Sequence, residues 1–161
     1  MATSQKKTAA PTSSKSKEAT ALLRADHKLV DALFDEYEKA RSSTKKKALV
    51  AQICQELTVH AQIEEEIFYP QVQEALKDRE LVPEAIVEHQ TLKDLIAQIE
   101  DAEPDEELYD ARVKVLSEYV KHHVKEEQNE IFPKVKKSNL DLKEIGAQLI
   151  ERKEELTSGL K

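Results

Sequence analysis

The chain contains no tryptophan, two glycines, five prolines and one cysteine among its 161 residues. Because glycine and proline interrupt helices, their scarcity in a chain rich in Glu, Lys, Ala and Leu predicts a nearly all-helical protein. Aromatic residues make up only 4% of the chain, so we expect a core of aliphatic side chains within one domain. The single cysteine, Cys54, cannot form an internal disulfide; this is compatible with a reducing compartment and excludes a Cys/His zinc finger.

Several other sequence features are missing. No apolar run approaches the roughly 18 residues of a membrane span, and the N-terminus lacks the apolar segment of a secretory signal. We therefore expect a cytoplasmic protein with no membrane partner. The net charge of −7 repels phosphate, which argues against nucleic acid as a partner. No Ser-His-Asp set, Gly-rich phosphate loop or His-Glu-x-x-His zinc motif is present.

The chain divides into a short tail and one domain. Residues 1–17 read MATSQKKTAAPTSSKSK, with four lysines and no acidic residue. Such a segment buries too little apolar surface to offset its ordering entropy, so we predict a disordered basic tail followed by a domain over residues 18–161.

The apolar periodicity predicts five helices in the domain. The expected ranges are about 18–41, 44–77, 83–100 and 104–136, with a shorter helix after residue 139. Because the connections are short, neighbouring helices should be antiparallel, which gives an all-α, up-down-up-down four-helix bundle with an additional C-terminal helix packed against it. Pro70 and Pro133 lie late in the second and fourth helices and predict a kink or a helix end there.

Two stretches of the chain share one pattern of histidine, glutamate and proline. Residues 60–70 read HAQIEEEIFYP and residues 123–133 read HVKEEQNEIFP, so that Glu follows His by four positions and Pro follows it by ten. A lone histidine precedes each stretch, His27 in RADHKLVDAL and His89 in IVEHQTLKDL, with an acidic residue directly before each. The chain therefore reads as two copies of one helical hairpin.

Helical spacing places these side chains in the core. His60 and Glu64 share one helix face, as do His123 and Glu127, and both faces continue as apolar stripes. His27 and His89 also lie on apolar stripes. Four imidazoles and two carboxylates should therefore converge, and leaving them buried and unpaired would cost several kcal/mol each.

Metal ions would satisfy such a cluster. Two carboxylates that bridge two ions hold them roughly 3.5–4 Å apart, with two imidazoles for each ion and open positions for water, hydroxide or a small molecule. Open sites of mixed nitrogen and oxygen ligands suit iron better than a closed structural zinc.

The order of these residues, with Phe and Pro after each pair, resembles the hemerythrin-like HHE cation-binding domain over about residues 20–136. The resemblance implies a four-helix bundle with a non-haem di-iron centre, in which carboxylates and an oxo or hydroxo group bridge two iron ions. It also implies which residues are the ligands, with the two glutamates as bridges: His27, His60, Glu64, His89, His123 and Glu127. The oxygen-carrying hemerythrins of marine invertebrates use a fifth histidine ligand, and no counterpart is evident here.

His122 raises an alternative. It lies about 100° around the helix from His123, so we expect it to face a groove or solvent. A register in which His122 and Glu126 replace His123 and Glu127 is disfavoured, because Pro133 would then follow the histidine by eleven residues. Phe68 and Phe132 are expected to line the pocket or simply to pack. Little weight falls on Tyr37, Tyr69, Tyr109 and Tyr119 as ligand-facing phenols, or on Cys54 as more than a packing residue.

Several functions remain open on this reading. The first is a protein that binds or senses oxygen, and the second an enzyme that disproportionates peroxide or handles nitric oxide under stress at the same centre. The histidine-rich ligand set, unlike the Glu-x-x-His pairs of ferritin-like bundles, favours both over hydrocarbon hydroxylation. An iron buffer or donor and a metal-free acidic interaction module are further alternatives. The expected ligand is a diatomic molecule or peroxide, and the sequence decides neither between iron, manganese and zinc nor between monomer and homodimer.

Overall fold

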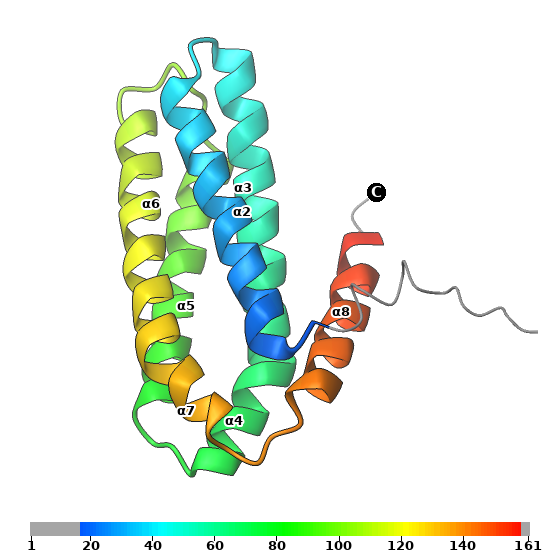
Figure 1. Ribbon diagram of the computed structural model, residues 1–161. Coiled ribbons are helices and arrows are strands. Elements are labelled where there is room, and N and C mark those ends of the chain that lie inside the picture. Colours follow the sequence, from blue (N-terminus) through cyan, green and yellow to red (C-terminus); the bar gives the residue numbers. More distant parts are fainter. Residues whose placement is uncertain (1–16, 159–161) are drawn as a thin grey trace, which may run out of the picture.

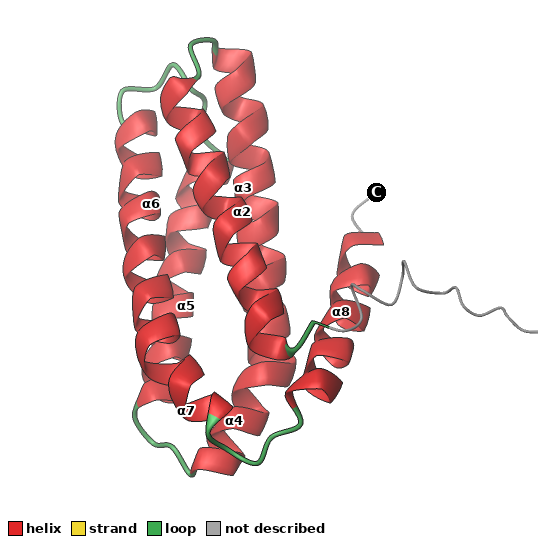
Figure 2. Cartoon of the chain, viewed as in Figure 1, coloured by secondary structure: helices red, strands yellow, loops and turns green. Residues whose placement is uncertain are grey.

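The computed structural model describes residues 17–158 as an antiparallel helical bundle. Four rods lie side by side and a fifth helix packs on the outside (Figure 1), and the described residues are helices joined by loops and turns (Figure 2). The predicted all-α bundle with an additional C-terminal helix is confirmed. The predicted disordered tail lies, except for Lys17, outside the described residues. The segments in chain order are α2 (Ala19–Lys39), α3 (Ser43–Ile63), η2 (Glu64–Phe68), α4 (Tyr69–Leu76), α5 (Leu81–Glu100), α6 (Tyr109–Glu126), η3 (Glu127–Ile131), α7 (Phe132–Lys136) and α8 (Leu142–Ser158).

Side-chain caps set the helix starts. The Ser42 hydroxyl accepts a hydrogen bond from the Lys45 N–H at 3.1 Å and begins α3. The Asp78 carboxylate accepts from the N–H groups of Leu81 and Val82, at 3.1 and 2.7 Å, and begins α5. Each bond satisfies a backbone donor that has no partner inside the helix.

The start of α6 differs from the prediction. The helix was expected from about residue 104, but residues 104–108 form turns and α6 begins at Tyr109. The Glu106 carboxylate accepts from the Glu103 N–H at 3.1 Å, which stabilises a turn in place of a helical first turn. Tyr109 is 1% exposed, so burial of its ring marks where the helix joins the core.

A π-helical segment ends two residues before each of the two prolines that were expected to kink or end a helix. In η2 the Tyr69 N–H bonds to the Glu64 carbonyl, and in η3 the Phe132 N–H bonds to the Glu127 carbonyl, each five residues back. Pro70 and Pro133 then lie in the first turns of α4 and α7, where a missing N–H costs little. The chain therefore stays helical past both prolines, and Figure 1 shows α7 inclined to α6.

The buried side chains form two apolar clusters with a polar layer between them. One cluster includes Val30, Leu57, Leu92 and Val120, and the other includes Leu23, Ile63, Ala85 and Ile131. Each of the four rods contributes residues to both clusters, and its candidate metal-ligating histidine lies in the sequence between the residue named from one cluster and the residue named from the other. The polar groups are thus concentrated at one level of the bundle and shielded on both sides.

Helix α8 packs against α2, α3 and η2. Gly146 makes the approach possible, because a Cβ added there would lie 2.4 Å from the Lys17 carbonyl oxygen. The helix also brings the Lys153 ammonium to 2.6 Å from Asp26. No helix among the described residues is both apolar and long enough to cross a bilayer.

Candidate metal centre

The structure brings all six candidate side chains together in the polar layer. Their exposed fractions run from 0% for Glu64 to 9% for His27. They come from four rods: His27 from α2, His60 and Glu64 from the α3–η2 junction, His89 from α5, and His123 and Glu127 from the α6–η3 junction. The repeat found in the sequence is therefore a spatial one, with each hairpin contributing two imidazoles and one carboxylate.

The nitrogen and oxygen atoms form two overlapping groups that share Glu64. One group comprises His27, His60, Glu64 and Glu127, and the other comprises Glu64, His89 and His123; within each group the ligand-type atoms lie within 4.8 Å of one another. Each group is compact enough to hold one cation.

Glu64 faces both groups through different oxygens. Its Oε2 lies 3.3 Å from His60 Nε2, and its Oε1 lies 3.1 Å from His89 Nε2. Glu127 Oε1 lies 3.1 Å from His27 Nε2, and the Nε2 atoms of His89 and His123 are 3.2 Å apart. One carboxylate oxygen toward each pair of imidazoles is the arrangement that a bridging ligand of two cations requires.

Four buried atoms in the centre have no hydrogen-bond partner among the described residues. They are Nε2 of His27 and of His60, Oε2 of Glu64 and Oε1 of Glu127. These atoms lie close to one another in pairs, but not in hydrogen-bonding geometry. Because a buried polar atom without a partner costs about 1–3 kcal/mol, four such atoms around one space fit a cation.

Each imidazole is oriented by a second hydrogen bond through its Nδ1 atom. The distances are 2.8 Å from His60 to Asp26, 2.6 Å from His123 to Glu88, 2.7 Å from His89 to Glu65 and 3.1 Å from His27 to Gln128. The three carboxylates accept from Nδ1, which turns Nε2 toward the centre and raises the basicity of the ring, whereas the Gln128 amide nitrogen can only donate to His27 Nδ1. The sequence carried a signal for two of them, since Asp26 and Glu88 are the acidic residues directly before the lone histidines.

The two halves of the centre differ at two positions of the repeat. Where the first copy has Glu65, the second has Gln128, so one imidazole partner in four is uncharged. Where the first copy has Tyr69, the second has Phe132, whose ring stacks parallel to the His27 ring at 6.1 Å between centroids. The half around His89 is therefore the more polar one.

Tyr69 received little weight from the sequence, and the structure places it in the centre. Its hydroxyl donates to Glu127 Oε2 at 2.5 Å and lies 3.1 Å from Glu64 Oε1. Tyr69 follows Glu64 by five residues, so an α-helix would turn the two apart, and the π-helical segment brings them to one face. Phe68 packs against Phe132 at 5.9 Å instead of facing the acids. Cys54 is a buried packing residue in the apolar cluster, and burial raises the pKa of its thiol to about 12.

His122 faces outward. Its side chain is 57% exposed, and its Nε2 lies 3.3 Å from Glu126 and 3.6 Å from Glu88. His123 and Glu127, one residue further on, point inward, so the alternative register with His122 and Glu126 in the core is not adopted.

The buried charges shift one another's titration. Burial alone would lower the pKa of His60, but Glu64 and Asp26 raise it well above its usual value. The pKa of His89 is raised to about 9 against the same opposing effect of burial, by Glu64 and Glu65. Burial and the two neighbouring carboxylates raise the pKa of Tyr69, which keeps its hydroxyl protonated and able to donate. In the metal-free chain, protons on His60 and His89 thus balance the carboxylates.

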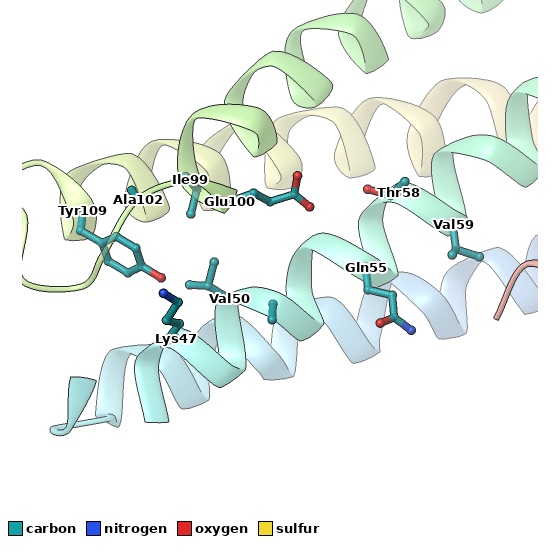
Figure 3. A pocket seen from close by; sticks show the side chains of 10 residues that line it. Lys47, Val50, Gln55, Thr58, Val59, Ile99, Glu100, Ala102 and Tyr109 are labelled. Atoms are coloured by element: carbon teal, nitrogen blue, oxygen red, sulfur yellow. The ribbon is translucent and has the colours of Figure 1, made fainter. Parts of the chain in front are cut away.

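The surface groove between α3 and α5 lies apart from this centre. It encloses about 450 Å³, and Figure 3 shows Val50, Ile99 and Tyr109 on its walls. None of the six candidate side chains lines this groove, so it is not part of the candidate metal centre.

The fold and the site together are those of a helical-bundle protein with a buried candidate cation site, in which two groups of imidazoles share one carboxylate. The family model of the hemerythrin HHE cation binding domain matches residues 18–135, and the chain belongs to this family.

Two known proteins show what the chain is similar to. It is 30% identical over 115 residues to a DNA nickase from Nostoc sp. strain PCC 7120, and the match spans 71% of this chain but only 32% of that protein. A crystal structure of a hemerythrin HHE cation binding domain-containing protein from Mycobacterium kansasii superposes with a TM-score of 0.76 at 24% identity and covers 89% of both chains. At that identity the second similarity supports the fold.

Proposed function

We propose that this chain binds two iron ions in the polar layer and uses them to bind or sense oxygen. Glu64 carries the proposal, because its two oxygens face two separate pairs of histidines. His27 and His60 would hold one ion and His89 and His123 the other, with Glu64 and Glu127 as bridges. A histidine-rich iron pair supplies reversible electron transfer and a free position for a small molecule.

The residues around the ions would keep the site dry and fix its protons. Phe132 covers the His27 ring, and the apolar clusters on both sides exclude water. The Tyr69 hydroxyl holds a proton directly beside Glu127 Oε2. An oxygen molecule bound nearby would therefore lie beside a protonated hydroxyl, in a polar layer that apolar side chains shield on both sides.

The same hydroxyl favours a second candidate, which is peroxide disproportionation. Splitting a peroxide bond consumes protons, and Tyr69 is a buried donor held in place by two carboxylates. The DNA nicking named for the Nostoc relative is not extended to this chain, which spans a third of that protein and carries a net charge of −7.

Metal analysis of natively purified protein tests the centre. We expect two iron ions per chain in the wild type, and a clear loss of iron in His60→Ala and in His123→Ala. His122→Ala is the matched control, because that side chain is exposed and adjacent to His123, and it should retain full iron content. Equal iron content in all three variants would contradict the proposed site, and a wild type without metal would favour a metal-free interaction module.

A second measurement separates the two functions. The iron-loaded protein is reduced without oxygen, exposed to oxygen, and followed by its visible spectrum. If the spectrum of the reduced protein is recovered when oxygen is removed, the result supports reversible binding or sensing. Rapid irreversible oxidation, together with oxygen release from added peroxide, supports the enzyme.

A further inference from the structure

A cavity of about 320 Å³ opens between α2 and the α6–η3 junction and ends at the His27–Gln128 pair beside the candidate metal centre. His27 and Gln128 lie at the cavity wall nearest the centre, and Phe34 and Val120 add apolar surface. His27 is the sole candidate ligand that lines this cavity among the described residues. A small molecule in the cavity would therefore be separated from the centre by the His27–Gln128 pair.

A second cavity that touches the centre is much smaller. It lies beside His123 between α5 and α6 and holds about 10 Å³, which is room for one water molecule. Its wall includes Glu84, Glu88 and Glu126, so negative charge surrounds it. A ligand larger than water, or a negatively charged one, is better accommodated on the α2 side.

Lysines surround the opening on the α2 side. Lys28, Lys121 and Lys125 line the cavity with one acidic residue, Asp31, and all four are exposed. Within the described part of the chain, none of the three ammonium groups has a carboxylate within 4.0 Å. The excess of positive charge is unusual on a chain of net charge −7, and such local fields raise the encounter rate of oppositely charged ligands.

The uncharged partner of the four imidazoles lies at this same cavity. Gln128 lies 3.1 Å from His27 Nδ1, whereas the corresponding residue of the other hairpin, Glu65, is a carboxylate paired with Lys93 at 2.9 Å. A carboxylate at position 128 would repel a negatively charged ligand just before it reached the centre. The amide of Gln128 carries no charge and does not repel an anion. Both the amide at this position and the lysines at the opening therefore favour a negatively charged ligand.

We propose that this cavity is the access route by which small monovalent anions reach the metal centre, steered by Lys28, Lys121 and Lys125. The inference rests on the proposed metal function and concerns the route of charged ligands, which are small oxygen- or nitrogen-containing anions; it leaves the binding of neutral oxygen unchanged. Neutral diatomic molecules gain nothing from the lysines.

The test uses azide as the anion and nitric oxide as the neutral molecule. The variant carries Lys28→Glu, Lys121→Glu and Lys125→Glu. The control carries Lys39→Glu, Lys45→Glu and Lys143→Glu, which changes the net charge equally at exposed positions that do not line the cavity. Stopped-flow absorbance gives the association rate of azide with the oxidised iron-loaded protein, and of nitric oxide with the reduced protein, at several salt concentrations.

We expect azide association with the cavity variant to slow by about tenfold or more at low salt, and its salt dependence to reverse from falling to rising. Nitric oxide association should stay within about twofold of wild type, and the control variant should follow wild type for azide. Lys121→Glu alone, which is expected to slow azide by about threefold, serves if the triple variant does not fold.

Equal azide rates in the cavity and control variants would overturn the access route while leaving the metal centre in place. Equal slowing of azide and nitric oxide would also overturn it, because charge would then not be the cause. A wild-type chain that takes up no iron would overturn the proposed function and the route together.

Discussion

Glu65 and Gln128 occupy equivalent positions of the two hairpins, yet one gives its imidazole a carboxylate partner and the other an amide. A carboxylate makes the imidazole a stronger metal ligand, so the ion near His89 should bind more tightly than the ion near His27. Single residues thereby make two otherwise similar halves unequal.

Exchanging these residues should change the two affinities in opposite directions. We expect Glu65→Gln to weaken the tighter ion by about 10–100-fold, and Gln128→Glu to strengthen the weaker one. Stepwise titration of metal-free protein with Fe(II), in competition with a coloured chelator and without oxygen, measures both. The interpretation is wrong if either substitution changes both affinities equally.

The Tyr69 hydroxyl is the second residue-scale feature to test. Tyr69→Phe places in the first hairpin the residue found at the matching position of the second. The ring remains, but Glu127 Oε2 loses its donor, so we expect metal-free protein to lose about 1–3 kcal/mol of unfolding free energy.

Urea unfolding of metal-free protein measures that loss. Tyr119→Phe removes the hydroxyl of a half-buried tyrosine outside the centre and should change the unfolding free energy little. If the two variants are equally stable, the hydrogen bond to Glu127 contributes nothing measurable.

Among the elements, the two π-helical segments have the clearest effect on the site. Each begins at the glutamate of a His-x-x-x-Glu pair and ends just before the aromatic–proline pair. The wider turn brings residues five apart to one face, which is how Tyr69 reaches Glu64. Helix α8 supports the centre from outside, since Lys153 bonds to Asp26, which in turn orients His60.

The docking of α8 depends on Gly146. Alanine has the higher helix propensity by about 1 kcal/mol, but its Cβ would lie 2.4 Å from the Lys17 carbonyl oxygen, so backbone must move. We expect Gly146→Ala to lower the unfolding free energy by about 1–3 kcal/mol. Ala147→Ser, at the exposed neighbouring position, is the control for denaturant unfolding. A Gly146→Ala protein more stable than wild type would show that α8 accommodates the methyl group.

At the scale of the whole molecule, the polar layer is a concentration of charge inside an apolar bundle. In the metal-free chain this charge is balanced by protons on His60 and His89, whose pKa values are raised. A metal cation would take the place of those protons. Stability, metal affinity and pH are therefore linked through the same buried groups.

This linkage has a definite sign. In the folded chain the pKa of His89 is about 9, against an ordinary value of 6.5. The stabilisation that protonated His89 gives the folded state is therefore complete below about pH 6.5 and is lost as the pH rises through about 9. We expect metal-free protein to lose roughly 3 kcal/mol of unfolding free energy across that window. Metal-loaded protein, with the imidazole deprotonated throughout, should not show this loss. Urea unfolding of both forms between pH 6 and 10 measures this difference. If the unfolding free energies of the two forms change with pH in the same way, His89 is not charged in the metal-free fold.

The sequence by itself determined the helical class and the inward face of each ligand-bearing helix. Scarce glycine and proline leave helix as the favoured local structure, and a spacing of four residues puts His60 beside Glu64, and His123 beside Glu127, on any α-helix. His122 was expected to face outward by the same geometry, and it does. These features follow from local rules, because the period of the helix relates residues close in sequence.

Tertiary structure alone decided which helices supply the partners of each imidazole. Asp26 and Glu88 were visible as acidic neighbours of histidines, but which imidazole each would orient depends on how the helices rotate against one another. Tyr69 was underestimated because its contact with Glu64 needs a π-helical turn, which the α-helical period does not contain. The lysines around the cavity come from two helices far apart in sequence, so their combined field exists only after the bundle has closed.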